Sequence, residues 1–167
     1  MNVFQRRTIA GSARCCVSAA AVLAVALVVA NAASAASSLT LRLTAPPHFS
    51  GAYGACPSGH VADTVTATDG ARLGALDGCI QTFTFFADGS DAFTATYTFD
   101  LRGGRVVTSV SGTETPTATG IVMAVSGSII GGTGRYAGVS GTINGGGPVD
   151  FTADPIQPDL TFNLAFA

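Results

Sequence analysis

The most constraining feature of the chain is a strict alternation of apolar and polar residues from Phe93 to Leu101. Apolar side chains occupy the odd-numbered positions and threonine or aspartate the even-numbered ones, the pattern of a half-buried antiparallel strand. Gly103 and Gly104 follow, and a second alternating segment begins at Val106, so the sequence predicts a β-hairpin here. Beyond residue 36 no helical period persists for more than a turn or two, and the domain is therefore expected to be all-β.

Other apolar or alternating segments extend this prediction to about eight strands, in a sandwich or a closed antiparallel barrel. Asp-Gly pairs at 69–70, 77–78 and 88–89 predict turns, and the Pro- and Gly-containing segment 44–57 predicts a long loop. Residues 113–116, with two threonines and a proline, are also expected to form a loop. Strands are predicted at residues 39–43, 60–68, 80–86, 93–101, 106–111, 121–130, 138–143, 149–152 and 160–166.

The N-terminal segment has the three parts of a secretory signal peptide. Arg6, Arg7 and Arg14 precede an apolar run over residues 17–30, and small residues at 33–35 offer a cleavage site. The run is too short to span a bilayer, which needs about 20 helical residues. We therefore expect residues 1–36 to be removed and residues 37–167 to form one secreted or extracytoplasmic domain. Sec export is favoured over the twin-arginine route, which Arg6 and Arg7 only loosely resemble.

The charge of the expected mature domain excludes two classes of partner. Three of the eight basic residues belong to the signal peptide and all ten acids lie beyond it, which leaves five arginines and a formal net charge of −5. A domain this acidic, with no lysine and no basic stripe, is not expected to bind nucleic acid or an anionic membrane. No stable membrane insertion is predicted either.

Two cysteines remain beyond the signal peptide, Cys56 and Cys79, and in an oxidising compartment they predict a disulfide. Closing a loop of this length stabilises a fold by roughly 3.5 kcal/mol in the chain-entropy model. The alternative is a metal or redox site, which needs closely spaced cysteines or nearby histidines. Only His48 and His60 are present, so the sequence predicts no metal site and no cofactor.

The glycine-rich stretch at 127–142 partly matches two phosphate-binding motifs, and neither match is complete. A P-loop requires a lysine that the chain lacks. A dinucleotide fingerprint is formally present at Gly132, Gly134 and Ala137, but it must open a helix, and the glycines at 138 and 141 disfavour one. We interpret the stretch as a glycine-rich β-turn, with direct ligand binding as the alternative.

The same stretch resembles the dirigent protein and allene oxide cyclase group, in which a strand ends in a Gly-Gly-Thr-Gly-Arg-Phe/Tyr turn followed by Ala-Gly and Gly-Thr. The resemblance implies an eight-stranded antiparallel, calycin-like barrel around an apolar cavity with a few polar groups, often in a homo-oligomer. It also implies either stereochemical control of radical coupling or closure of an epoxide into a ring. The matching residues are Gly131, Gly132, Thr133, Gly134, Arg135, Tyr136, Ala137, Gly138, Gly141 and Thr142.

Three charged residues are candidates for catalysis. Glu114 is the only glutamate, and it continues the face of the predicted strand at 106–111. It could therefore point inward at the barrel mouth, where burial would raise its pKa; the alternative is a solvated residue at a strand end. The same two alternatives, an inward-facing acid or a solvated one, apply to Asp63. Arg135 could hold an anionic group, or form a surface ion pair.

Three aromatic residues, Tyr97, Phe99 and Tyr136, are candidates for ligand binding, with core packing as the alternative. The first hypothesis for the function is a secreted barrel that binds a small apolar or aromatic molecule. The second is a cyclase or dirigent-like template that works by positioning a reactive substrate. The third is a structural or surface protein without a ligand. Whether the chain is an enzyme stays open at this point.

Overall fold

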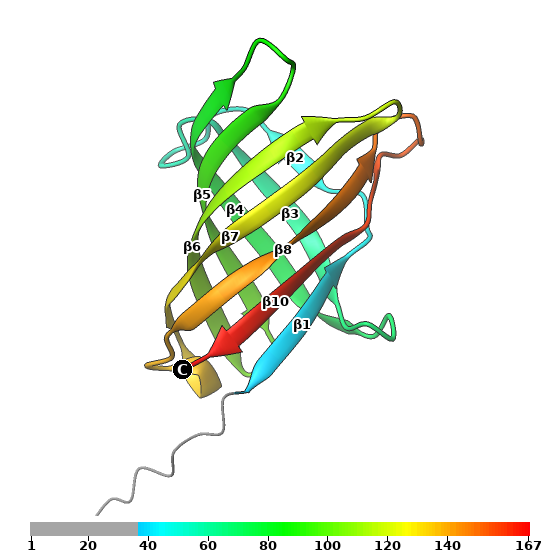
Figure 1. Cartoon of the computed structure of the whole chain (residues 1–167). Coiled ribbons are helices and arrows are strands. Elements are labelled where there is room, and N and C mark those ends of the chain that lie inside the picture. Colours follow the sequence, from blue (N-terminus) through cyan, green and yellow to red (C-terminus); the bar gives the residue numbers. More distant parts are fainter. Residues whose placement is uncertain (1–36) are drawn as a thin grey trace, which may run out of the picture. The chain divides into compact units, whose positions relative to one another are not determined.

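The computed structural model describes residues 37–167, so the predicted signal peptide lies outside the described residues. The described part is all-β and contains no α-helix (Figure 1). No helix in this part is long and apolar enough to cross a membrane. The elements are β1 (Ser38–Leu43), β2 (His48–Ser50), β3 (Gly59–Thr66), β4 (Arg72–Phe85), β5 (Asp91–Leu101), β6 (Gly104–Pro116), β7 (Gly120–Gly132), the 3₁₀ turn η1 (Gly134–Tyr136), β8 (Gly141–Asp150), β9 (Gln157–Pro158) and β10 (Leu160–Phe166).

Eight strands form a closed antiparallel barrel in the order β1, β10, β8, β7, β6, β5, β4 and β3. The barrel closes where Arg42 of β1 pairs with Thr66 of β3, and the Thr66 hydroxyl donates a hydrogen bond of 3.1 Å to the Arg42 carbonyl. The short β2 pairs with β3 further along, and β9 pairs with β8. The predicted eight-stranded antiparallel barrel is confirmed.

The hairpin of β5 and β6 shows how the sequence pattern builds the wall. The odd-numbered residues of β5 are buried and the even-numbered ones are largely half-buried or exposed, as the alternation predicts. The two strands pair without interruption from Leu101 opposite Gly104 to Asp91 opposite Glu114. This unbroken register places Glu114 on the inward face of β6, directly across from Asp91.

Four local predictions were wrong. The hairpin turn predicted at Gly103-Gly104 lies one residue earlier, at Arg102-Gly103, because Gly104 already pairs with Leu101. The pair Asp77-Gly78 does not turn, because both residues lie inside the single strand β4. Gly78 is opposite Tyr97, and a Cβ there would lie 3.3 Å from the Tyr97 ring and 2.4 Å from Val61. The glycine therefore makes room for side chains inside the barrel. The strands predicted at 138–143 and 149–152 are one strand, β8, and residues 113–116 continue β6 through its pairing with β5 and β7.

The loop predicted at 44–57 contains one short strand, β2, which aligns with β3. The glycine-rich stretch after β7 forms a tight turn as expected, with Gly134 at a φ of +61° opening the single 3₁₀ turn η1. A disulfide joins Cys56, in the loop before β3, to Cys79 in β4, with 4.9 Å between the Cα atoms. The predicted disulfide is confirmed.

The two ends of the barrel differ. We call the end with η1 and the β5–β6 turn the closed end, and the end with the β4–β5 hairpin and the β6–β7 turn the open end (Figure 1). Apolar side chains fill the closed half, where several are fully buried, whereas the open half contains a cavity. The largest fully buried apolar residues are Phe99, Phe162, Leu41, Leu43, Ile143, Leu164, Val65 and Val106.

Candidate ligand-binding cavity

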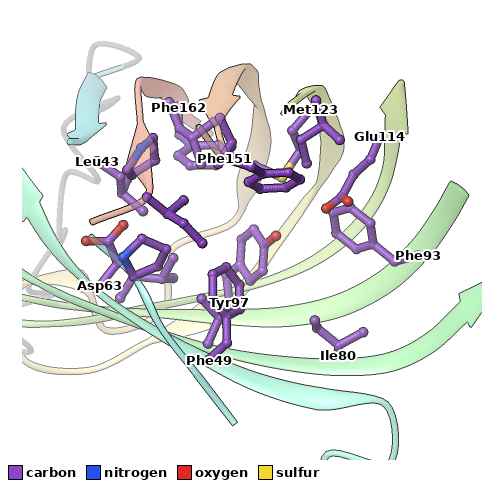
Figure 2. A pocket seen from close by; sticks show the side chains of 18 of the residues that line it. Leu43, Phe49, Asp63, Ile80, Phe93, Tyr97, Glu114, Met123, Phe151 and Phe162 are labelled. Carbon is purple, nitrogen blue, oxygen red and sulfur yellow. The ribbon is translucent and has the colours of Figure 1, made fainter. Parts of the chain in front are cut away.

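The open half of the barrel holds a cavity of about 450 Å³ (Figure 2). Of the 19 residues that line it, 17 are apolar or aromatic, and Asp63 and Glu114 are the two charged ones. Strands from all sides of the barrel contribute, together with the segments at 44–47 and 151–156 near the mouth. A cavity of this size and composition is typical of sites for small organic molecules.

Three aromatic rings form the floor between the cavity and the closed half. Tyr97 and Phe162 line the cavity with ring centroids 6.1 Å apart in an edge-to-face arrangement. Phe99 lies outside the set of lining residues, fully buried, with its centroid 6.3 Å from Tyr97 and 6.2 Å from Phe162. Edge-to-face aromatic packing of this kind adds roughly 1 kcal/mol per pair beyond area burial. The floor is therefore a fixed boundary of the cavity.

Phenylalanine side chains form one wall. Phe83 and Phe93 are nearly parallel, with ring centroids 6.2 Å apart, and the Phe93 ring lies over Gly112, where a Cβ would come within 2.2 Å of it. A β-bulge in β4 between Ile80 and Thr82 turns both Ile80 and Phe83 toward the cavity. A glycine and a bulge thus shape this wall.

Asp91 and Glu114 form a carboxyl pair beside the cavity. Glu114 lines the cavity, and Asp91, across from it in β5, is only 7% exposed. The Oδ1 atom of Asp91 is buried and has no hydrogen-bond partner among the described residues. Burial, the neighbouring charge of Asp91 and a hydrogen bond to Asp91 raise the pKa of Glu114 to about 7, and burial also raises the pKa of Asp91. The pair therefore shares a proton near neutral pH.

The second cavity acid and a tyrosine are also perturbed. Burial raises the pKa of Asp63 to about 6, against the lowering effect of a hydrogen bond from the Thr64 amide. Burial and then the charge of Glu114 raise the pKa of Tyr97, so its hydroxyl stays protonated. Figure 2 shows Asp63 and Glu114 on opposite sides of the cavity, with Tyr97 between them.

No basic residue is among those that line the cavity. Arg42 forms an ion pair of 2.8 Å with Asp159, and Arg105 lies 3.5 Å from Asp100, in both cases between solvent-exposed side chains. His60 lies 3.0 Å from Asp77. The described residues contain no group of three or more histidine, cysteine or acidic side chains placed to hold a metal ion. The charge inside the cavity is therefore of one sign.

The candidate residues predicted from the sequence divide between the two ends. Glu114, Asp63 and Tyr97 line the same cavity, and Phe99 lies beneath it. Arg135 and Tyr136 lie in the turn η1 at the closed end and do not line this cavity. The Arg135 guanidinium is 5.0 Å from the centroid of the Tyr136 ring, and that ring stacks on Phe166 at 5.9 Å. The structure does not bring Arg135 together with the acids.

Asp91 was missed by the sequence analysis. The predicted two-residue turn at Gly103-Gly104 would pair Arg102 with Arg105 and place Asp91 opposite Pro116, whereas the observed turn lies one residue earlier and places Asp91 opposite Glu114. Position 91 also continues the odd-numbered inward face of the strand. The alternation of 93–101 therefore extends back to Asp91, and the side chain of this residue lies inside the barrel.

Because of the raised pKa values of the cavity acids, we expect the stability of the protein to fall as the pH rises. Because folding raises the pKa of Glu114 and Asp63, the folded chain binds more protons than the unfolded chain between about pH 4 and pH 7, and stability falls as pH rises through this window. Asp88 and Asp150, whose pKa values are lowered by hydrogen bonds from serine and threonine, lose their contribution only at lower pH.

We therefore expect the free energy of unfolding, measured with urea, to be higher at about pH 5 than at about pH 8. Glu114→Gln should stabilise the protein by about 1–2 kcal/mol at the higher pH, after allowance for its partial exposure, and by little at the lower pH. The control is Asp100→Asn, which removes an exposed acid. Equal stability of wild type and Glu114→Gln at both pH values would show that Glu114 is solvated.

No family model matches the chain, and searches of curated proteins and of solved structures also find no match. The resemblance to dirigent proteins and allene oxide cyclases therefore stays a prediction that rests on residues 131–142.

Proposed function

We propose that the chain is a β-barrel that binds a small apolar or aromatic molecule in the cavity at its open end. The observation that carries the proposal is the 450 Å³ cavity in which 17 of the 19 lining residues are apolar or aromatic. A cavity of this volume is within the usual range of about 300–1,000 Å³ for ligand sites. Transfer of an apolar ligand from water into it gains about 25 cal/mol for each Å² buried.

The mouth of the cavity supports the same proposal. Phe49 and Phe151 line the cavity and are each about half exposed, and Phe85 and Phe86 are exposed at the tip of the β4–β5 hairpin. Exposed aromatic side chains at a mouth provide an apolar path from solvent to the interior. A structural protein without a ligand has no need of such a mouth or of an unfilled open half.

A second candidate is a cyclase, an isomerase or a dirigent-like template. The specific observation in its favour is the carboxyl pair of Asp91 and Glu114, because a group with a pKa of about 7 is suited to proton transfer at neutral pH. The cavity holds no arginine to accompany it. Binding is therefore the primary proposal, and action outside the cytoplasm, which the disulfide favours, is part of it.

The proposal is tested with a matched pair of tryptophan variants in the protein expressed from its full sequence. The chain has no tryptophan, so an introduced indole is a unique fluorescent reporter. Met123→Trp fills the cavity from β7, whereas its neighbour Val122 is 44% exposed and faces outward. The neutral apolar dye N-phenyl-naphthylamine serves as the ligand.

We expect the dye to bind the wild type and Val122→Trp, and to bind Met123→Trp at least roughly tenfold more weakly, a change of about 1.4 kcal/mol. The indole of Met123→Trp should emit at shorter wavelength than that of Val122→Trp because it is buried. Failure of the wild type to bind the dye, or equal binding by the two variants, would show that the cavity is not the site.

A further inference from the structure

All the ionisable groups that carry charge at the cavity are carboxyl groups, and no basic side chain lines the cavity to neutralise them. Asp63 and Glu114 line the cavity, Asp91 lies against Glu114, and no arginine or histidine is among the lining residues. An anionic ligand would meet repulsion at either acid. A neutral ligand would leave the carboxylates desolvated without compensation, which is costly in an apolar surrounding.

The carboxyl pair offers one unfilled position for a hydrogen-bond donor. Asp91 is more than nine-tenths buried, and its Oδ1 atom has no hydrogen-bond partner among the described residues. An ammonium group carries a positive charge and three N–H donors, so it can neutralise the pair and donate to both residues. Asp63 differs, because its carboxylate already accepts a hydrogen bond from the Thr64 amide.

Aromatic rings beside the pair are also suited to a cation. Phe93 and Tyr97 line the cavity from β5, the strand that carries Asp91 (Figure 2). The faces of such rings attract ammonium groups by roughly 0.5–2 kcal/mol, more when water is excluded. No other charged group faces Glu114 from its neighbours, since β7 contributes the uncharged Met123 opposite it.

We propose that the ligand is an amine, with an apolar body held by the cavity walls and one ammonium group bound between the carboxylates of Glu114 and Asp91. The inference rests on the proposed binding function and specifies the class of ligand. Binding displaces the proton that the two carboxyl groups share and releases it to solvent, while the amine keeps its own proton. Affinity for an amine therefore rises with pH as Glu114 loses its proton.

The test uses three probes with the same apolar body: naphthylmethylamine, naphthylmethanol and naphthoate. Their affinities are measured by isothermal titration calorimetry in buffers of different ionisation enthalpy, at about pH 5 and about pH 8. We expect the amine to bind roughly 10- to 100-fold more tightly than the alcohol at the higher pH, and naphthoate most weakly. Near pH 6 the amine should release a proton on binding and the alcohol should release none.

Variants locate the ammonium group. Glu114→Gln should bring the ratio of amine to alcohol affinity within about threefold, because one charge-assisted hydrogen bond is lost. Asp100→Asn removes the same charge from the outer face, where Asp100 is paired with Arg105, and should preserve the ratio. Asp91→Asn tests the other carboxyl group of the pair. Proton release is measured on the wild type and therefore does not depend on the folding of any variant.

The outcomes separate this inference from the function on which it rests. If the alcohol binds as tightly as the amine at both pH values, the proposed function stands and the amine assignment is overturned. If Asp63→Asn abolishes the preference and Glu114→Gln does not, the assignment to the carboxyl pair is overturned. If none of the three probes binds, the proposed function itself fails.

Discussion

Phe99→Ala is expected to lower the free energy of unfolding by about 4 kcal/mol, the loss typical of a large aromatic side chain removed from a tightly packed core. Phe99 has no exposed surface and contacts the floor residues Tyr97 and Phe162 edge-on or tilted. Its removal would leave a void below the cavity that the surrounding strands cannot close. Urea unfolding followed by circular dichroism measures the loss.

Phe86→Ala is the matched control, because Phe86 is half exposed at the tip of the β4–β5 hairpin. Its stability should stay within about 0.5 kcal/mol of the wild type. A loss below about 1 kcal/mol for Phe99→Ala, or equal losses for the two variants, would mean that the barrel interior is not packed as described.

The second large effect concerns the disulfide. The double variant Cys56→Ser with Cys79→Ser should lose about 3.5 kcal/mol of stability, because the bond closes a loop of 23-residue separation and restricts the unfolded chain. The bond also ties the segment after β2 to β4, so that Phe49 and Ile80 of the cavity are held near each other. The dye affinity of the double variant should therefore fall as well.

Reductant provides the control for this prediction. It should lower the stability of the wild type to that of the double variant and have no effect on the double variant itself. Two results would contradict a stabilising disulfide. One is a wild type whose free energy of unfolding is the same with and without reductant, and the other is a double variant as stable as the wild type.

Much of the wall could be predicted from local pattern. The alternation at 93–101 and the glycine pair at 103–104 predict the hairpin and the inward face of Asp91. They do not predict its partner, because a turn at 103–104 would oppose Asp91 to Pro116, and the observed turn at 102–103 opposes it to Glu114. The placement of Arg135 could also have been predicted. Successive turns of an up-and-down barrel alternate between its ends, so the turn after β7 lies at the end opposite to the tip of β6 that carries Glu114.

The remainder depends on contacts between distant segments. Asp77-Gly78 has the composition of a turn, but pairing with both β3 and β5, and the close approach of Val61 and Tyr97 to Gly78, explain why a strand passes through it. Asp63 faces the cavity that contains Glu114 because β3 closes the barrel against β1, and no local pattern reports closure. The unfilled half is likewise a property of side chains from the whole barrel.

The most direct test of the central claim locates a bound probe by nuclear magnetic resonance. Methyl groups of isoleucine, leucine and methionine are labelled, and intermolecular nuclear Overhauser effects to naphthylmethanol are recorded. The account predicts contacts to Met123, Ile80 and Leu160, which line the cavity, and none to Ile143 in the closed half. Contacts confined to the exposed Ile130 on the outer face, or a probe that does not bind, would contradict an interior binding site.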